Sequence, residues 1–201
     1  MTFATDQDQI QRLLAKYFLK NPIATYHIHP NGQVSCDGGV QVHILDLDRL
    51  PVAWHKVEGT FDVSSTSLRT LEGCPRIARA FDCSHTRITN LEGGPTWVAQ
   101  SYTALNCREL TSLQGLPQRL GPSMIAPPWI HLDYREDLPL LRLLTVKGLD
   151  DIKLNAGQDN NKPHARQVEQ IVKRYLGKGW AAMVPCAREL IRAGYRGMAK
   201  I

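Results

Sequence analysis

Two consecutive stretches of this chain repeat nearly the same twenty residues. Residues 61–80 read FDVSSTSLRTLEGCPRIARA, and residues 81–100 read FDCSHTRITNLEGGPTWVAQ. A third copy starts at Tyr102 with one extra residue, and the three copies carry LEGCP, LEGGP and LQGLP at the same place. Repetition at a fixed period of this length is typical of solenoids, because one unit is too small to bury its own apolar face.

Each copy predicts a short strand with inward apolar side chains, followed by a turn and a Gly-Pro loop. The corresponding apolar residues are Phe61, Val63, Leu68 and Leu71 in the first copy, Phe81, Cys83, Ile88 and Leu91 in the second, and Tyr102, Ala104, Leu110 and Leu113 in the third. A small residue, Thr66, Thr86 or Cys107, is expected to point inward where the strand turns. Degenerate copies are expected at residues 42–51 and 124–139.

The repeats resemble the leucine-rich repeat, whose pattern is L-x-x-L-x-L-x-x-N/C-x-L, over about residues 40–121. They differ from its common form by an aromatic first strand position, by Thr in place of Asn in two ladders, and by EG-x-P in place of a helix or longer loop. This variant is most similar to repeats of small proteins encoded by tailed bacteriophages and some bacteria. The resemblance implies a helix and a hairpin before the repeats and a helical tail after them, but it implies no activity.

Residues 1–39 are expected to form an N-terminal helix and β-hairpin. Apolar residues recur three and four positions apart between Ile10 and Phe18, which predicts a helix over residues 6–19. The pair Asn31-Gly32 between two short β-favouring runs predicts the tight turn of a hairpin.

Residues 147–201 are expected to form a basic C-terminal helical unit, because two apolar stripes at helical spacing follow a polar linker. The apolar segment 138–154 is expected to be a short helix or a last strand that covers the open end of the solenoid. The expected fold class is therefore α+β, with a short leucine-rich-repeat-like solenoid over residues 40–146 flanked by an N-terminal helix and β-hairpin and by a C-terminal helical unit.

Composition favours an ordinary globular protein, since 43% of the residues are hydrophobic and 21% are charged. No run of apolar residues is long enough for a membrane span, and the N-terminus has no secretion-signal pattern. We therefore expect a cytoplasmic protein without membrane contact, and the host cytoplasm if it is phage-encoded. The five cysteines form no C-x-x-C motif and are expected to be reduced and mostly buried.

The outward side chains of the repeat strands form the first candidate surface for protein binding, because a solenoid holds them at rigid, close spacing. These residues are Asp62, Ser64, Ser65, Asp82, Ser84, His85, Thr103, Leu105 and Asn106. Among them Ser65, His85 and Asn106 differ between the copies, and we expect the fold to leave them free to vary. Rival aromatic anchors for a partner are Trp54, Trp97, Trp129 and Trp180.

Basic residues of the C-terminal unit form the second candidate surface, because eleven Lys and Arg face five Asp and Glu over residues 147–201. The nucleic-acid-binding candidates are Lys162, Arg166, Lys173, Arg174, Lys178, Arg188, Arg192 and Arg196, with His164 beside them. A solvated pair of helices explains the same residues without any partner.

His27, His29, Cys36 and His43 form the most tempting metal constellation, because H-x-H places two imidazoles on one face of a strand. Exposed alternating residues give the same pattern, so we expect neither a metal nor another cofactor. Cys83 and His85 invite a thiol-imidazole interpretation, but the repeat assigns Cys83 to a buried apolar position.

The sequence contains no catalytic motif that carries a mechanism, so the expected function is not enzymatic. We expect a protein-protein interaction module, and the phage resemblance implies an accessory protein that binds or inhibits a bacterial host or defence protein. Nucleic-acid binding through the basic helices is the alternative. A hydrolase or transferase site in the groove between solenoid and tail is the third hypothesis.

Overall fold

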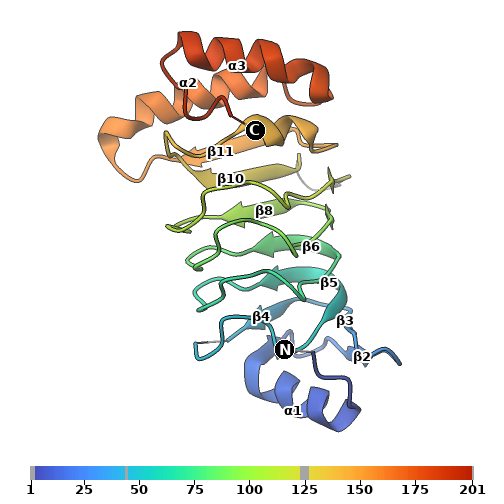
Figure 1. Cartoon of the computed structure of the whole chain (residues 1–201). Helices are drawn as coiled ribbons and strands as arrows, with labels where there is room; N and C mark the ends of the chain where they lie inside the picture. Colours follow the sequence, from blue (N-terminus) through green and yellow to red (C-terminus); the bar gives the residue numbers. More distant parts are fainter. Residues whose placement is uncertain (1–2, 44, 123–126, 201) are drawn as a thin grey trace.

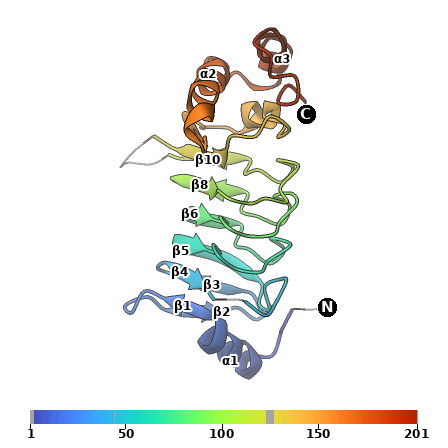
Figure 2. The same cartoon turned by 90° about the vertical axis from the view of Figure 1, so that its left-hand side faces the viewer.

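The computed structural model describes residues 3–43, 45–122 and 127–200, and its main feature is a β-solenoid. The successive strands β4 (Val40–Val42), β5 (Trp54–Asp62), β6 (Ile77–Asp82), β8 (Ser101–Ala104), β10 (Trp129–Asp133) and β11 (Asp151–Asn155) pair side by side in parallel. Figure 2 shows these strands along one side of the molecule and the connecting turns along the other. The expected solenoid and its mixed α+β class are thus confirmed.

Equivalent residues of successive copies lie directly opposite each other in the sheet. Phe61 is aligned with Phe81, Phe81 with Tyr102, and Tyr102 with Ile130. Successive side chains along a strand alternate between inward and outward positions, so the aligned strands bury the same positions in each copy. The extra residue of the third copy therefore lies in its turn and leaves the strand register unchanged.

A second, shorter stack of strands runs beside the first. It contains β3 (Val34–Cys36), the first halves of β5 and β6, and then β7 (Trp97–Val98) and β9 (Arg119–Leu120). Strand β5 reaches both stacks because its register shifts between Val57 and Thr60. Gly59 lies in this shift, and a Cβ there would be 2.3 Å from the backbone nitrogen of Gly39, so only glycine fits.

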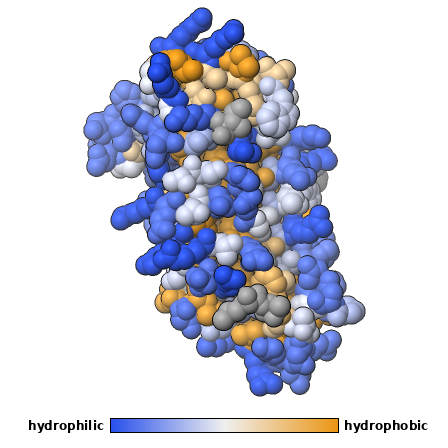
Figure 3. Space-filling view, in the orientation of Figure 1, coloured by the Kyte–Doolittle hydropathy of each residue, from blue (hydrophilic) through white to orange (hydrophobic). Residues whose placement is uncertain are grey.

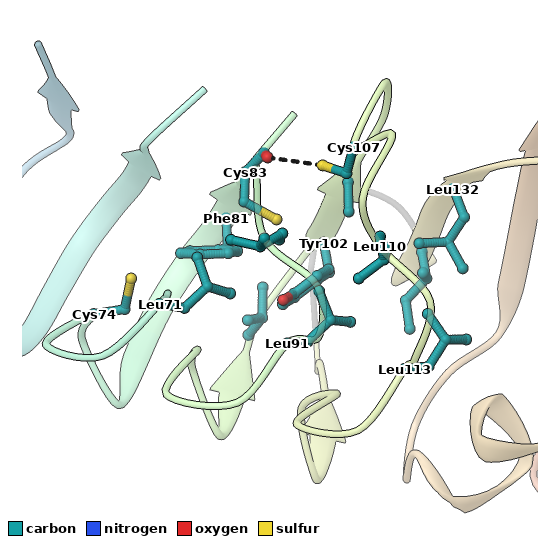
Figure 4. Close-up of a cluster of buried hydrophobic side chains, with 14 of the residues drawn as sticks. Leu71, Cys74, Phe81, Cys83, Leu91, Tyr102, Cys107, Leu110, Leu113 and Leu132 are labelled. Carbon is teal, nitrogen blue, oxygen red and sulfur yellow. Dashed lines mark hydrogen bonds between the residues drawn. The ribbon is translucent and has the colours of Figure 1, made fainter. Parts of the chain in front are cut away.

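The core contains a column of aromatic rings in contact with one another. Phe18, Trp54, Phe61, Phe81 and Tyr102 follow one another with ring centroids 5.0 to 6.3 Å apart, and all five are buried. Figure 4 shows the leucines of successive turns, Leu71, Leu91 and Leu113, in a row beside this column. All the inward apolar positions expected from the three repeats are buried. The residues that recur in the repeats are therefore the residues that form the core.

Two polar atoms in this core have no hydrogen-bond partner among the described residues. They are the Tyr102 hydroxyl and the Trp54 indole nitrogen Nε1. Burial raises the pKa of Tyr102 well above its ordinary value. The aromatic column therefore contains two buried donors whose desolvation is not compensated by a hydrogen bond within the described part of the protein.

The inward-pointing threonines tie each turn to the strand before it. The Thr66 hydroxyl donates to the Val63 carbonyl at 2.8 Å, and the Thr86 hydroxyl donates to the Cys83 carbonyl at 2.7 Å. Both threonines are buried, as the sequence predicts. Figure 4 shows the third residue of this column, Cys107, whose thiol donates to the Cys83 carbonyl at 3.2 Å.

The recurring LEG motifs are explained by how the turns stack. Gly73, Gly93 and Gly115 have φ of 91°, 83° and 92°, a conformation that side chains disfavour. A Cβ at Gly93 would lie 2.6 Å from the Glu72 nitrogen, and one at Gly115 would lie 2.2 Å from the Glu92 nitrogen. Gly93 and Gly115 are therefore required both by their own φ and by the turn they lie on, whereas a Cβ at Gly73 would meet the Phe3 ring.

The N-terminal residues form α1 (Gln7–Tyr17), β1 (Phe18–Lys20) and the antiparallel pair β2 (Tyr26–Ile28) and β3. The helix expected over residues 6–19 is too long, because Phe18 already belongs to β1 and is aligned with Val42 of β4. Pairing with β4 and burial against the aromatic column stabilise the extended conformation more than a further helical turn would. Between β2 and β3, Gly32 has a φ of 77°.

The C-terminal residues cover the last strand. Residues 138–154 were expected to form a helix or a strand, and they contain both: the 3-10 helix η1 (Leu141–Thr145) and most of β11. After the short 3-10 helix η2 (Asp159–Asn161), α2 (Lys162–Lys173) packs on β11, and Glu169 accepts the Leu154 N–H at 2.6 Å. The chain then forms η3 (Gly179–Ala182) and α3 (Met183–Arg192). No helix in the described ranges has the length and hydropathy needed to cross a bilayer.

We predict that Thr66→Val lowers the free energy of unfolding by about 1–3 kcal/mol, because the buried Val63 carbonyl loses its hydroxyl donor. Thr66→Ser is the matched control, since it keeps the hydroxyl and is expected to retain more of the stability. Urea unfolding followed by circular dichroism measures both variants. Equal stability of the Val variant and the parent protein would contradict the assigned role of this hydrogen bond.

We predict that stability falls as the pH rises above about 9, because burial raises the pKa of Cys74 from its ordinary value of 9.0. The unfolded chain loses this proton first, so the stabilisation is complete below pH 9 and is lost above it. In Cys74→Ala the slope of the unfolding free energy against pH becomes shallower by about 1.4 kcal/mol per pH unit. Urea unfolding between pH 8 and 10.5 tests this, and parallel slopes for the two proteins would disprove it.

Candidate functional site

The outward side chains of the parallel strands form a straight ladder across the side of the solenoid that carries the strands in Figure 2. We define the outer ladder as the seven residues aligned in one row of the sheet, which are Leu19, Gln41, Asp62, Asp82, Thr103, His131 and Lys153. Neighbouring members are about 4.8 Å apart, as strand spacing dictates. Only Asp62, Asp82 and Thr103 were candidates from the sequence. The other four lie in strands outside the clear repeats.

The centre of the outer ladder is acidic. Asp62 and Asp82 lie on adjacent strands, and each accepts the N–H of the serine two residues later at 2.8 Å. Gln41 donates to the second carboxylate oxygen of Asp62 at 3.5 Å. One oxygen of each carboxylate therefore holds the turn, and the pair creates a local negative charge on the strand face.

Ser84 differs from the other strand-face candidates because it is buried, with 5% of its surface exposed. Its hydroxyl oxygen accepts the Leu105 N–H of the next turn at 3.0 Å. The equivalent Ser64 is only partly buried. Ser84 therefore joins two turns of the solenoid and presents little surface to a partner.

Ser65, His85 and Asn106 are exposed, but the fold does not leave them free to vary. Their φ angles are 57°, 58° and 55°, in the left-handed region that costs most side chains about 1–2 kcal/mol. They follow the strands rather than lie on them, and the Asn106 amide nitrogen lies 3.3 Å from His85 Nε2. Asn106 and His85 belong to residue types enriched in this conformation, whereas the serine at position 65 gives no sign of it.

An aromatic and cationic group occupies the C-terminal end of the outer ladder. The Lys153 ammonium lies 4.7 Å from the centre of the Trp129 ring, and the rings of Trp129 and His131 meet edge to face at 5.6 Å. Burial, and then the charge of Lys153, lower the pKa of His131, so this imidazole is neutral at pH 7. The charge of the ladder therefore changes from negative at Asp62 and Asp82 to positive at Lys153.

The four tryptophans occupy different surroundings. Trp54 is buried in the core, and Trp97 donates from its indole nitrogen to the Gly121 carbonyl at 2.7 Å. Trp129 lies partly exposed beside the outer ladder, whereas Trp180 is largely exposed in η3. Trp97 is partly exposed as well, so only Trp54 is withheld from contact with a partner.

Half of the basic residues proposed for nucleic-acid binding are engaged within the protein. Lys173 lies 2.6 Å from Asp151, Lys162 lies 2.6 Å from Asp159, and Arg174 pairs with Glu189. Lys178 lies 5.5 Å from the centre of the Tyr175 ring. The remaining candidates are exposed and form no ion pair with another described residue: Arg166, Arg188, Arg192 and Arg196.

The structure does not gather the residues considered for a metal site. His27 lies 3.9 Å from Asp37, whereas His29 contacts the Ser35 hydroxyl at 2.8 Å, and Cys36 is buried. His43 follows β4. Within residues 3–43, 45–122 and 127–200, no group of three His, Cys, Asp or Glu side chains is placed to hold an ion.

The cysteines are free thiols, and all five are buried, as the sequence predicts for most of them. Cys83 lies in the core, while His85 lies exposed in the following turn. Hydrogen bonding with the side chains of Cys83 and Thr86 lowers the pKa of Cys107 to about 7. Because Cys107 is only 3% exposed, a substrate cannot reach its sulfur without opening the turn.

The groove between solenoid and tail lies between β11 and α2 and is lined by Asp159, Lys162 and Glu169 among others. Its two carboxylates are engaged, since Asp159 pairs with Lys162, and Glu169 accepts the Leu154 N–H. Among the described residues this leaves no pair of free carboxylates in the groove for acid and base chemistry.

The outer ladder offers rigid hydrogen-bonding groups, a change of charge along its length, and one aromatic ring, which together suit recognition of another protein by shape and charge. Comparison of the chain with protein-family models, curated proteins and solved structures found no match.

We predict that Ser65→Val lowers the free energy of unfolding by about 1–2 kcal/mol, because a β-branched residue disfavours the left-handed conformation found there. Ser65→Gly is expected to keep or slightly raise the stability, since glycine adopts this φ without a steric cost. Ser101→Val, in strand β8, serves as the control and is expected to be tolerated. Thermal unfolding of the three variants measures the difference; a loss from Ser65→Val no larger than that from Ser101→Val would refute it.

Proposed function

We propose that this chain is a non-enzymatic protein-protein interaction module that binds its partner through the outer ladder. The observation that carries the proposal is the alignment of seven outward residues on adjacent strands of one sheet. The six steps between them span about 29 Å at the usual strand spacing, a length comparable to that of a standard protein interface. Backbone hydrogen bonding fixes the spacing of these residues before binding, which lowers the entropy lost on association.

The chemistry of the ladder indicates what a partner must present. A cationic group is needed opposite Asp62 and Asp82, and an anionic or hydrogen-bonding group opposite Lys153. Trp129 lies beside the C-terminal end of the ladder and supplies the aromatic contact on which binding energy commonly concentrates. Neutral His131 can donate or accept one hydrogen bond there.

We extend this proposal to the origin of the repeats. The pattern FDCS-x-T-x-I-T-x-LEG-x-P supports a leucine-rich-repeat-like solenoid of the kind found in phage-encoded proteins, with the N-terminal helix and hairpin and the C-terminal helices as its flanking units. The partner is then a bacterial host or defence protein, and binding inhibits it in the host cytoplasm. The support for this extension is the sequence pattern and the order of the elements.

Nucleic-acid binding is the second candidate function, and the exposed Arg166, Arg188, Arg192 and Arg196 favour it. Such binding is electrostatic and weakens steeply with salt. A mobility-shift assay with duplex DNA and with RNA at low salt tests it. A shift that salt abolishes supports this second function, whereas no shift at low salt excludes it.

We predict that Thr103→Arg weakens partner binding by about tenfold or more, because a long cation at the centre of the ladder disrupts shape and charge complementarity. Affinity capture from bacterial lysate with the tagged protein supplies the partner, and titration with the purified partner measures the dissociation constant. Asp82→Asn is expected to weaken binding less, since it removes the charge but keeps an oxygen that can accept the Ser84 N–H.

Gln118→Arg is the matched control, because Gln118 is exposed and lies in a turn away from the outer ladder. It introduces the same side chain and is expected to leave binding unchanged. Circular dichroism verifies that all variants are folded. Retention of full affinity by Thr103→Arg, or an equal loss in Gln118→Arg, would count against binding through the ladder.

A further inference from the structure

The outer side of α3 carries an apolar stripe. Trp180, Val184 and Ile191 are 66%, 60% and 44% exposed, and their spacings of four and seven residues place them on one side of the η3 and α3 segment. The inner side of α3 carries the buried Met183, Leu190 and Cys186. Hydrophobic surface is visible at this end of the molecule in Figure 3. The segment thus has two apolar sides, and only one is used for packing within the protein.

The stripe is unusual because its exposed side chains are large and lie together. A packed helix normally presents charged or polar groups to solvent, and a contiguous exposed apolar patch marks an interaction site. Trp180 belongs to the residue type that most often anchors an interface. The exposed apolar side chains Leu19, Ile23 and Leu45 lie in the N-terminal part of the chain, at the other end of the solenoid.

The charges around the stripe are almost all positive. From residue 178 to residue 200 the chain contains five basic residues and one acid, Glu189. Glu189 is already held by Arg174 and by the Tyr175 hydroxyl at 2.9 Å. Arg188 and Arg192 project from α3 itself and form no ion pair with a described residue. The apolar stripe is therefore bordered by arginines that no carboxylate of the described chain neutralises.

We propose that this side of α3 docks an acidic amphipathic helix of a partner protein. The stripe extends over twelve residues from Trp180 to Ile191, which corresponds to about 17 Å of helix and matches the apolar face of a partner helix of about three turns. Carboxylates beside that apolar face would pair with Arg188 and Arg192. This surface lies at the C-terminal end of the molecule (Figure 1), so its use does not depend on the outer ladder.

A second copy of this chain fits the stripe poorly. A symmetric contact through α3 would bring Arg188 and Arg192 of the two copies toward each other, and like charges at an interface cost stability. Nucleic acid would engage the arginines but would leave Val184 and Ile191 without an apolar partner. The combination of apolar and cationic groups is satisfied by a partner that is apolar on one side and acidic at its borders.

The test uses the full chain and a fluorescein-labelled peptide of about 18 residues, or five helical turns. The peptide carries leucines at positions i, i+3, i+4 and i+7 and glutamates at the flanking positions, and a matched peptide carries lysine in place of every glutamate. Fluorescence anisotropy is expected to show binding of the acidic peptide that weakens with salt. It is expected to show at least about tenfold weaker binding of the lysine peptide.

Variants of exposed residues assign the binding to α3. Val184→Ser and Ile191→Ser are each expected to weaken binding of the acidic peptide severalfold, and Arg188→Gln with Arg192→Gln to reduce its salt dependence. Gln118→Ser, at an exposed solenoid residue outside both surfaces, is the control and is expected to bind like the parent protein. Circular dichroism verifies that the α3 variants are folded.

Four results would overturn the proposal. These are failure of the acidic peptide to bind, equal binding of the two peptides, full affinity of the folded Val184 and Ile191 variants, and a self-association of the protein that the same variants abolish. Binding to vesicles of phosphatidylcholine with phosphatidylserine is measured as well. Binding to these vesicles that requires Val184 and Ile191, without binding of the acidic peptide, would assign the stripe to a lipid surface instead.

Discussion

Parallel backbone hydrogen bonding between successive turns is the constraint on which the rest of this structure depends. The Val63 N–H donates to the Asp82 carbonyl at 2.8 Å, and the Cys83 N–H donates to the Thr103 carbonyl at 2.9 Å. Because these bonds fix the register, every position of one turn lies on the same position of the next. A residue type that packs well at a position in one copy therefore packs well at the same position in the next. This explains why the sequence repeats.

The register also explains which features the sequence predicts and which it does not. The repeat period, the buried apolar positions and the inward threonines are predictable, because each recurs in at least two copies at the same spacing. The end of α1 is not, since Phe18 fits a helical stripe as well as a strand, and only its pairing with Val42 decides between them. The left-handed turn conformation is also hard to predict, because the three copies place Ser, His and Asn at this position and serine does not favour a positive φ.

The candidate site could be predicted only where the copies are clear. Asp62 and Asp82 follow from the aligned repeats, whereas His131 and Lys153 join the same row from strands whose sequences have diverged. The burial of Ser84 and its bond to the Leu105 N–H were not predictable either, because the equivalent Ser64 is only partly buried. The pairing of Lys173 with Asp151 and of Arg174 with Glu189 depends on how α2 packs on β11 and on α3, which local periodicity does not specify. The charge of these basic residues was visible in the sequence, but the carboxylates they would meet were not.

The covered ends of the solenoid give the molecule a fixed length. Helix α1 lies at one end of the stack and α2 lies over β11 at the other (Figure 1), where Glu169 accepts a backbone N–H of the last strand. New turns therefore cannot add at the ends, and the stack can lengthen only by insertion of a whole repeat between two existing turns. Each insertion would add one residue to the outer ladder and would move α3 about 4.8 Å farther from the N-terminal hairpin. The distance between α3 and the N-terminal hairpin can consequently change only in discrete steps of one strand spacing.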